Sequence, residues 1–262
     1  MCTVVVLRRP GHDWPLLLAA NRDEMADRPW SPPARHWEDR ADVVAGRDDL
    51  AGGTWLGLND SGVVAGILNR FRTLGPQDGK RSRGELVLEA LDHADAADAA
   101  EALAALDPAA YRPFNMVIAD NRDAFWVRHA GQPGARGVEV LPIPEGLSML
   151  TAFELNDAAA DPRIALHRPR FLAAPPPDPE TGSWESWQAL LASREAGPPD
   201  AGVSRGAAMC FQMDTGFGTR SSSLIALPSP ERAVLKAPAA DPVWLFAAGP
   251  PDRAPYSRVA MA

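Results

Sequence analysis

The order in which strand-like and helix-like segments follow one another constrains the fold of this chain most. Short runs of apolar and β-branched residues, separated by turn-forming residues, predict β-hairpins at the start of the chain and again in its middle. The helix-like segments come in separate groups and do not alternate singly with the strands. Because single alternation of strand and helix is what builds a parallel sheet, this grouping predicts an α+β fold. We expect antiparallel sheets with helices on their outer faces.

The boundaries of these segments follow from hydrophobic periodicity and turn signals. The predicted strands are 3–7, 15–20, 54–58, 63–68, 114–119, 124–128, 138–143, 147–152, 207–212, 223–227, 233–235 and 243–246. The predicted helices are 86–91, 94–106, 162–172 and 183–193, and a polar loop is expected from 21 to about 40. Residues 1–262 are predicted to form one domain. Stretches rich in Pro and Gly flank the last helix, so 173–206 is either a mobile flap or an ordinary surface excursion.

The charge and the cysteine content limit the classes of partner and the cellular compartment that we expect. The net charge is -8, from 26 basic and 34 acidic residues, which argues against nucleic acid as the main partner. Two cysteines, no signal-peptide pattern and no long apolar run predict a cytoplasmic protein without integral membrane association. The histidines are scattered without metal-ligand spacing, so neither a metal nor a tightly bound cofactor is expected. The oligomeric state is left open.

Cys2 is the first candidate for a reactive group. Removal of Met1 would leave this residue with both a thiol and a free α-amino group. An α-amine has a pKa of roughly 8, so it can accept the proton of the thiol near neutral pH. One residue would then hold the nucleophile and the base that covalent acyl transfer requires. The position of Cys2 alone is equally consistent with a cysteine that packs as a small hydrophobic residue.

A charged tetrapeptide, Asn21–Glu24 with the sequence Asn-Arg-Asp-Glu, follows the second strand of the first hairpin. A hairpin brings its two outer ends together, so these residues are expected to lie close to Cys2. A carboxylate at Asp23 could hold or orient the amine, and the charge of Arg22 could lower the pKa of the thiol. A solvated charged turn is the simpler interpretation of the same residues.

Taken together with four later segments, these residues resemble the NRDE family, also called the transport-and-Golgi-organisation family. The segments are Gly52–Gly57 (Gly-Gly-Thr-Trp-Leu-Gly), Asn69, Ser82–Val87 (Ser-Arg-Gly-Glu-Leu-Val) and Gly218–Ser221 (Gly-Thr-Arg-Ser). They occur in the family's order and span residues 1 to about 225. Each segment alone is a weak signal, and their joint occurrence is specific.

The resemblance implies an N-terminal-nucleophile (Ntn) hydrolase fold, a four-layer αββα sandwich. It also implies a distant similarity to the bile-salt hydrolase and penicillin V acylase group, cysteine enzymes that cleave amides. In that group an aspartate like Asp23 serves the cysteine, two asparagines shape the oxyanion site, and a late arginine lies near the cysteine. The counterparts expected here are Asn69, Asn156 and Arg220, although each is also explained as a turn residue or a surface ion pair. The group's arginine three residues before the aspartate is replaced by Ala20, and Arg22 is expected to face away from Cys2 because adjacent residues of an extended strand alternate.

Two functions remain open at this stage. The first is a cysteine Ntn hydrolase that cleaves a small-molecule amide through an acyl-enzyme, with Cys2, Asp23, Asn69, Asn156, Arg220 and Arg22 as its site. The second follows from the family's link to haem mobilisation and lipid homeostasis. It is a haem- or acyl-lipid-binding and trafficking protein on the same fold, without hydrolysis, for which haem would be a ligand.

Overall fold

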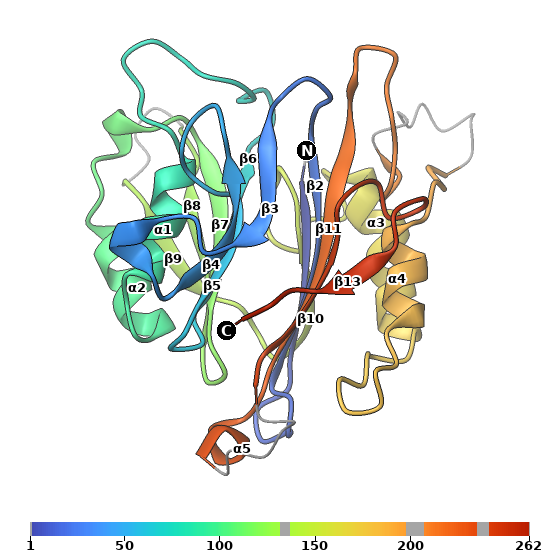
Figure 1. Ribbon diagram of the computed structural model, residues 1–262. Helices are drawn as coiled ribbons and strands as arrows, with labels where there is room; N and C mark the ends of the chain where they lie inside the picture. Colours follow the sequence, from blue (N-terminus) through green and yellow to red (C-terminus); the bar gives the residue numbers. More distant parts are fainter. Residues whose placement is uncertain (1, 132–136, 198–206, 235–240, 262) are drawn as a thin grey trace. The chain divides into compact units, whose positions relative to one another are not determined.

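The computed structural model describes residues 2–131, 137–197, 207–234 and 241–261 (Figure 1). The chain divides into two compact units. The first unit comprises Met1–Asp27 and Glu145–Val259, and the second comprises Arg28–Pro144 and Ala260–Ala262. Each unit contains one antiparallel sheet with a pair of helices packed on it, which are one β layer and one α layer of the predicted αββα fold.

The sheet of the first unit has the strand order β10-β1-β2-β11-β12-β13. Its strands are β1 Thr3–Arg8, β2 Leu16–Met25, β10 Gly146–Leu150, β11 Phe217–Leu227, β12 Val243–Ala247 and β13 Tyr256–Arg258. The helices α3 (Pro162–Ala173) and α4 (Glu185–Leu191) lie on one side of this sheet in Figure 1. Alternate strand residues such as Val5, Leu17 and Leu224 pack against apolar residues of these helices such as Phe171 and Trp187, which forms the core of the unit.

The central strands of this sheet place the start of the chain. Strand β1 pairs with β2 so that Thr3 is opposite Asn21, and β2 pairs on its other side with β11 so that Asp23 is opposite Thr219. The loop predicted from residue 21 onwards is therefore wrong over its first residues, because β2 continues to Met25. The polar side chains there find buried partners, which allows the strand to extend beyond its apolar part. The amide of Asn21, for example, donates to the carbonyls of Leu191 and Met209 at 2.9 and 2.8 Å.

The sheet of the second unit has the order β3-β4-β5-β6-β7-β8-β9. Its strands are β3 Trp30–Ala34, β4 Val43–Asp48, β5 Leu56–Asn59, β6 Val64–Asn69, β7 Phe114–Ala119, β8 Ala124–His129 and β9 Glu139–Pro142. Helices α1 (Gly84–Leu91) and α2 (Ala96–Ala104) bury apolar faces against it, and the 3-10 turns η1 (Glu38–Arg40) and η2 (Pro108–Ala110) lie in its connections. The predicted strands 54–58, 63–68, 114–119 and 124–128 and both predicted helices are confirmed here, with shifts of a few residues at their ends.

Two of the sequence motifs meet inside this second unit. The amide of Thr54 donates to the carbonyl of Gly84 at 3.0 Å, so the Gly-Gly-Thr-Trp-Leu-Gly segment contacts the start of α1. A Cβ atom built on Gly53 would lie only 2.5 Å from the carbonyl carbon of Gly84. These glycines therefore allow one backbone to approach another, which is a structural role.

Two predicted strands near the end of the chain are wrong. Residues 207–211 are buried but form no strand, because their carbonyls bind other groups: Met209 accepts from Asn21, and Phe211 accepts from the amide of Thr219. Residues 233–234 end the short helix α5 (Pro230–Val234), and Leu235 lies outside the described residues.

The predicted flap is described only in part. Helix α4 packs Trp187 and Leu191 into the core of the first unit, whereas residues 198–206 lie outside the described part of the chain. The flap and the single-domain assignment stay predictions. In the part of the chain that the structure describes, no helix is long and apolar enough to span a bilayer.

Candidate active site

Cys2 lies immediately before β1 and is half-buried. Its thiol points to the backbone carbonyl of Asp23, with Sγ 3.8 Å from the oxygen. Burial raises the pKa of this thiol above its ordinary value, the negative charge of Asp23 raises the pKa further, and the positive charge of Arg22 lowers it. Two of the three charged residues of the tetrapeptide thus act on Cys2, and burial of the thiol disfavours its thiolate form.

The carboxylate of Asp23 is the centre of a buried polar cluster, which we call the Asp23 cluster: Thr3, Asp23, Arg163 and Thr219. Nη1 of Arg163 donates to Oδ2 of Asp23 at 2.9 Å, and Oγ1 of Thr219 donates to Oδ1 at 2.8 Å. The side chains of Arg163 and Asp23 are 1% and 0% exposed, so this is a fully buried ion pair. Such a pair fixes its members firmly, because separating either partner leaves a buried charge uncompensated.

The same arginine also holds the strand that carries Cys2. Nη1 of Arg163 donates to Oγ1 of Thr3 at 2.6 Å, and Thr3 is the first residue of β1. The guanidinium lies over the ring of Phe211, with Cζ 5.2 Å from the ring centroid. The Asp23 cluster therefore connects β1, β2, β11 and α3 next to the residue predicted to be the nucleophile.

Local sequence explains why α3 brings Arg163 to this point. Asp161 is the N-cap of the helix and accepts from the amide of Arg163 at 2.8 Å, and Pro162 occupies the first helical position. The hydroxyl of Thr151 donates to the other oxygen of Asp161. The start of α3 is thus tied to the segment that follows β10, which fixes where its first side chains lie.

Arg22 projects from the opposite face of β2. Asn21 and Asp23 both contact groups on the α3–α4 side, so alternation directs Arg22 to the other face, where it is buried. This alternation was predicted from the sequence, and the charge of Arg22 nevertheless lowers the pKa of the Cys2 thiol. The carboxylate of Asp23 accepts hydrogen bonds from Arg163 and Thr219.

Asn156 has a clear structural task. It adopts a left-handed backbone conformation, with φ of 61°, and its Oδ1 accepts from the amide of Met149 at 2.8 Å. Its Nδ2 donates to the hydroxyl of Ser148 at 3.2 Å. Strand β10 is the edge strand of its sheet, and Asn156 accepts a hydrogen bond from a backbone amide of this strand.

Arg220 and Asn69 lie in different units. Arg220 sits at a β-bulge of β11, where its Nε donates to the carbonyl of Glu24 at 3.0 Å and its Nη2 to Gln212 and Gly216. These bonds fasten the turn between residues 212 and 218. Asn69 is the last residue of β6 in the second unit, half-buried and opposite Phe114.

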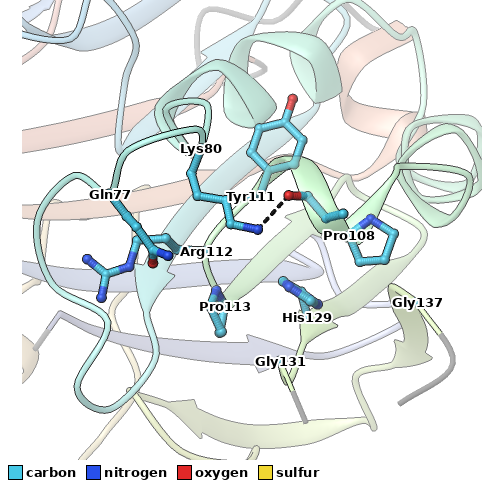
Figure 2. Close-up of a pocket in the computed structure, with 10 residues that line it drawn as sticks. Gln77, Lys80, Pro108, Tyr111, Arg112, Pro113, His129, Gly131 and Gly137 are labelled. Atoms are coloured by element: carbon cyan, nitrogen blue, oxygen red, sulfur yellow. Dashed lines mark hydrogen bonds between the residues drawn. The ribbon is translucent and has the colours of Figure 1, made fainter. Parts of the chain in front are cut away.

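A pocket of about 370 Å³ lies in the second unit, between the loops around Lys80, η2 and the end of β8 (Figure 2). Nζ of Lys80 donates to the carbonyl of Ala109 at 2.5 Å at this pocket, and His129 forms part of its wall. Burial and the nearby charge of Lys80 lower the pKa of His129. None of the predicted site residues lines the pocket. Among the residues that the structure describes, no three His, Cys, Asp or Glu side chains gather as a metal site requires.

Comparison with known proteins identifies the family. The family model described as Transport and Golgi organisation 2 matches residues 1–158. The chain belongs to this family. The match covers Cys2, the tetrapeptide, Gly52–Gly57, Asn69 and Ser82–Val87, whereas Gly218–Ser221 lies beyond it.

Curated members of the family are similar to part of the chain. The Transport and Golgi organization 2 homolog of Mus musculus is 34% identical over 108 residues, and the Homo sapiens homolog is 36% identical over 110 residues. In both comparisons the match spans 40% of this chain and 38% of the length of the relative.

Solved structures show the fold of this family member. A Caenorhabditis elegans orthologue of N-acylethanolamine-hydrolyzing acid amidase has a TM-score of 0.54 and 13% identity, over 85% of this chain and 92% of that chain. Penicillin V acylase from Agrobacterium tumefaciens has the same TM-score and identity, over 94% and 83%. At this identity the likeness concerns the fold, which is that of Ntn hydrolases.

Sequence reasoning missed three members of the Asp23 cluster: Thr3, Arg163 and Thr219. A signal for Arg163 was present in the sequence. Arg163 and His167 share the helical stripe of Ile164 and Phe171, and all four are buried. An arginine on an apolar helix face requires a buried acidic or polar partner, and Asp23 is the acidic residue of the predicted site.

Proposed function

We propose that this chain is a cysteine Ntn hydrolase that cleaves the C–N bond of a small-molecule amide. The observation that carries the proposal is the placement of Cys2, half-buried at the start of β1, 3.8 Å from the backbone of Asp23 and beside the ion-paired Asp23 cluster. The Ntn-hydrolase fold supports it, because the fold neighbours are amide-cleaving acylases by name. Fold similarity alone does not assign an activity.

Because the pKa of the Cys2 thiol is raised, the proposed reaction depends on a group that removes the thiol proton. A thiol of this kind requires a local base, and the α-amine freed by removal of Met1 is attached to the same residue. The amine takes the proton from Sγ, and the thiolate attacks the carbonyl carbon of the substrate. The C–N bond then breaks, and the leaving amine takes the proton from the α-ammonium, which leaves a thioester on Cys2.

Water completes the cycle. The α-amine takes a proton from water as the oxygen attacks the thioester carbonyl. The C–S bond breaks, the sulfur takes back the proton, and a carboxylic acid is released. Overall, one water is consumed and one amide becomes an acid and an amine, so no oxidant or metal is required for balance.

The remaining predicted residues take supporting roles in this proposal. Arg22, whose charge lowers the pKa of the thiol, stabilises the thiolate, whereas the guanidinium of Arg220 holds the neighbouring turn. Asn156 has a second Nδ2 proton beyond the one that it donates to Ser148, and it is the proposed oxyanion donor. Asn69 belongs to the other unit, and its role stays a prediction from the sequence.

The direct test is hydrolysis of amides by the purified protein. N-acylethanolamines of several chain lengths and penicillin V are suitable first substrates, because proteins of the same fold are named for them. We expect turnover by the wild-type chain and by Cys210→Ser, and at least a hundredfold loss in Cys2→Ala. Equal turnover in Cys2→Ala would contradict the proposed nucleophile. Absence of turnover with all amides, together with a retained haem or acyl lipid, would favour the carrier alternative.

A further inference from the structure

We propose that Arg163 is a positioning residue for Cys2, which acts by holding Asp23 and the first residue of β1 in one buried cluster. The inference deepens the proposed function and rests on it for its catalytic meaning. Its structural part concerns the reactivity of the Cys2 thiol, which is measurable without any substrate.

Geometry supports a positioning role. A single nitrogen, Nη1 of Arg163, donates to Asp23 at 2.9 Å and to Thr3 at 2.6 Å. Thr3 adjoins Cys2 in the chain, and the backbone carbonyl of Asp23 faces the Cys2 thiol. The guanidinium therefore contacts both residues that border the nucleophile.

Charge supports the same role. The carboxylate of Asp23 acts on Cys2 in the direction that disfavours the thiolate. Arg163 lies against that carboxylate with both side chains fully buried, so its positive charge offsets the effect in a region of weak screening. Without this arginine, Cys2 would face an uncompensated negative charge, and the thiolate would form less readily.

The anchoring of Arg163 makes the effect specific. Its amide is held by the N-cap Asp161, and its guanidinium lies over Phe211, so the side chain is restricted along its whole length. A lysine carries the same charge but is a point charge without the planar guanidinium, and it is not expected to serve Thr3 and Asp23 together.

The test measures the rate at which iodoacetamide alkylates Cys2 between pH 5 and 10. All variants carry Cys210→Ser, so that Cys2 is the one cysteine of the sequence. We expect Arg163→Gln, which removes the positive charge that offsets Asp23, to move the midpoint of the rate profile upward by about half to one pH unit. Arg170→Gln is the matched control, because Arg170 is on the same helix but pairs with Glu195 at the surface. We expect no shift for it.

Two further variants provide a test if Arg163→Gln folds poorly. Asp23→Asn combined with Arg163→Met removes both buried charges, and we expect its midpoint to return to within about 0.3 pH units of the parent. Thr3→Val removes only the hydroxyl contact, and we expect a lower plateau rate with little change in midpoint. Native circular dichroism and urea unfolding establish that each variant is folded.

The outcomes separate this inference from the proposed function. Profiles of folded Arg163→Gln and Thr3→Val that match the parent would overturn the positioning role, whatever the enzyme does. A shifted profile in a protein that cleaves no amide would support the positioning role and contradict the hydrolase.

Discussion

At the scale of single residues, neighbouring side chains of β2 have opposite surroundings. Asn21 and Asp23 reach the α3–α4 side, and Arg22 is buried on the other face. The alternation of side chains along a strand predicts this division. The sequence also predicted that Cys2 and the tetrapeptide lie close together. The sequence marks Arg163 as an arginine on an apolar helix face, but its pairing with Asp23, 140 residues away, depends on how α3 packs.

Asn156 provides a stability test at the same scale. Met149 is fully buried, and its amide depends on Oδ1 of Asn156, so loss of that acceptor is expected to cost about 1–3 kcal/mol. Asn156→Ala adds about 1 kcal/mol of strain because φ is 61°, whereas Asn156→Gly avoids that strain. Urea unfolding should rank the proteins wild type, Gly variant, Ala variant, from most to least stable. An Ala variant as stable as the Gly variant would contradict this explanation.

At the scale of elements, the prediction succeeded where hydrophobic periodicity was strong, and it missed strands β3, β4 and β13. Helices α1 to α4 and the strands from β5 to β8 were recognised. Strand β3 was missed because it contains two prolines, which an edge strand tolerates and a central strand does not. Strand β13 was missed because it is only three residues long.

The contact between Gly53 and the start of α1 leads to a prediction about stability. A Cβ atom on Gly53 would lie within 3.0 Å of three backbone atoms of Gly84 and Glu85, and backbone cannot move aside cheaply. We expect Gly53→Ala to lower the free energy of unfolding by about 1–3 kcal/mol. Gly66→Ala is the control, because its Cβ would meet the end of the flexible Leu56 side chain at 3.0 Å. A larger loss in the control, measured by urea unfolding, would show that the close approach of α1 is unimportant.

The buried His167 of helix α3 predicts how the stability of the protein depends on pH. Burial lowers the pKa of His167 from 6.5 to about 4. Between these values the unfolded chain binds a proton that the folded chain excludes, so stability falls as the pH is lowered from about 6.5 to 4, by roughly 3 kcal/mol at most. His167→Gln should be less sensitive over this range, because its amide does not titrate. Urea midpoints from pH 4 to 7.5 test this, and parallel curves for the two proteins would refute it.

At the scale of the whole molecule, the chain builds its first unit from two separate segments and its second mainly from one. The fold class was predictable because the grouping of hairpins and helices is a property of the sequence. The site was predictable only in part. Cys2, Asp23 and Arg22 are neighbours in one hairpin, whereas Asn69 belongs to the other unit and Arg163 comes from a distant helix.

The central claim is that a freed Cys2 is the nucleophile, and intact-mass measurement with peptide mapping tests it most directly. We expect the mature protein to lack Met1 and, when quenched with acid during turnover of an amide, to carry the acyl group of that substrate on Cys2. The Cys2→Ala variant should carry none. A natively folded protein that retains Met1, or an acyl group found on another residue, would contradict the account.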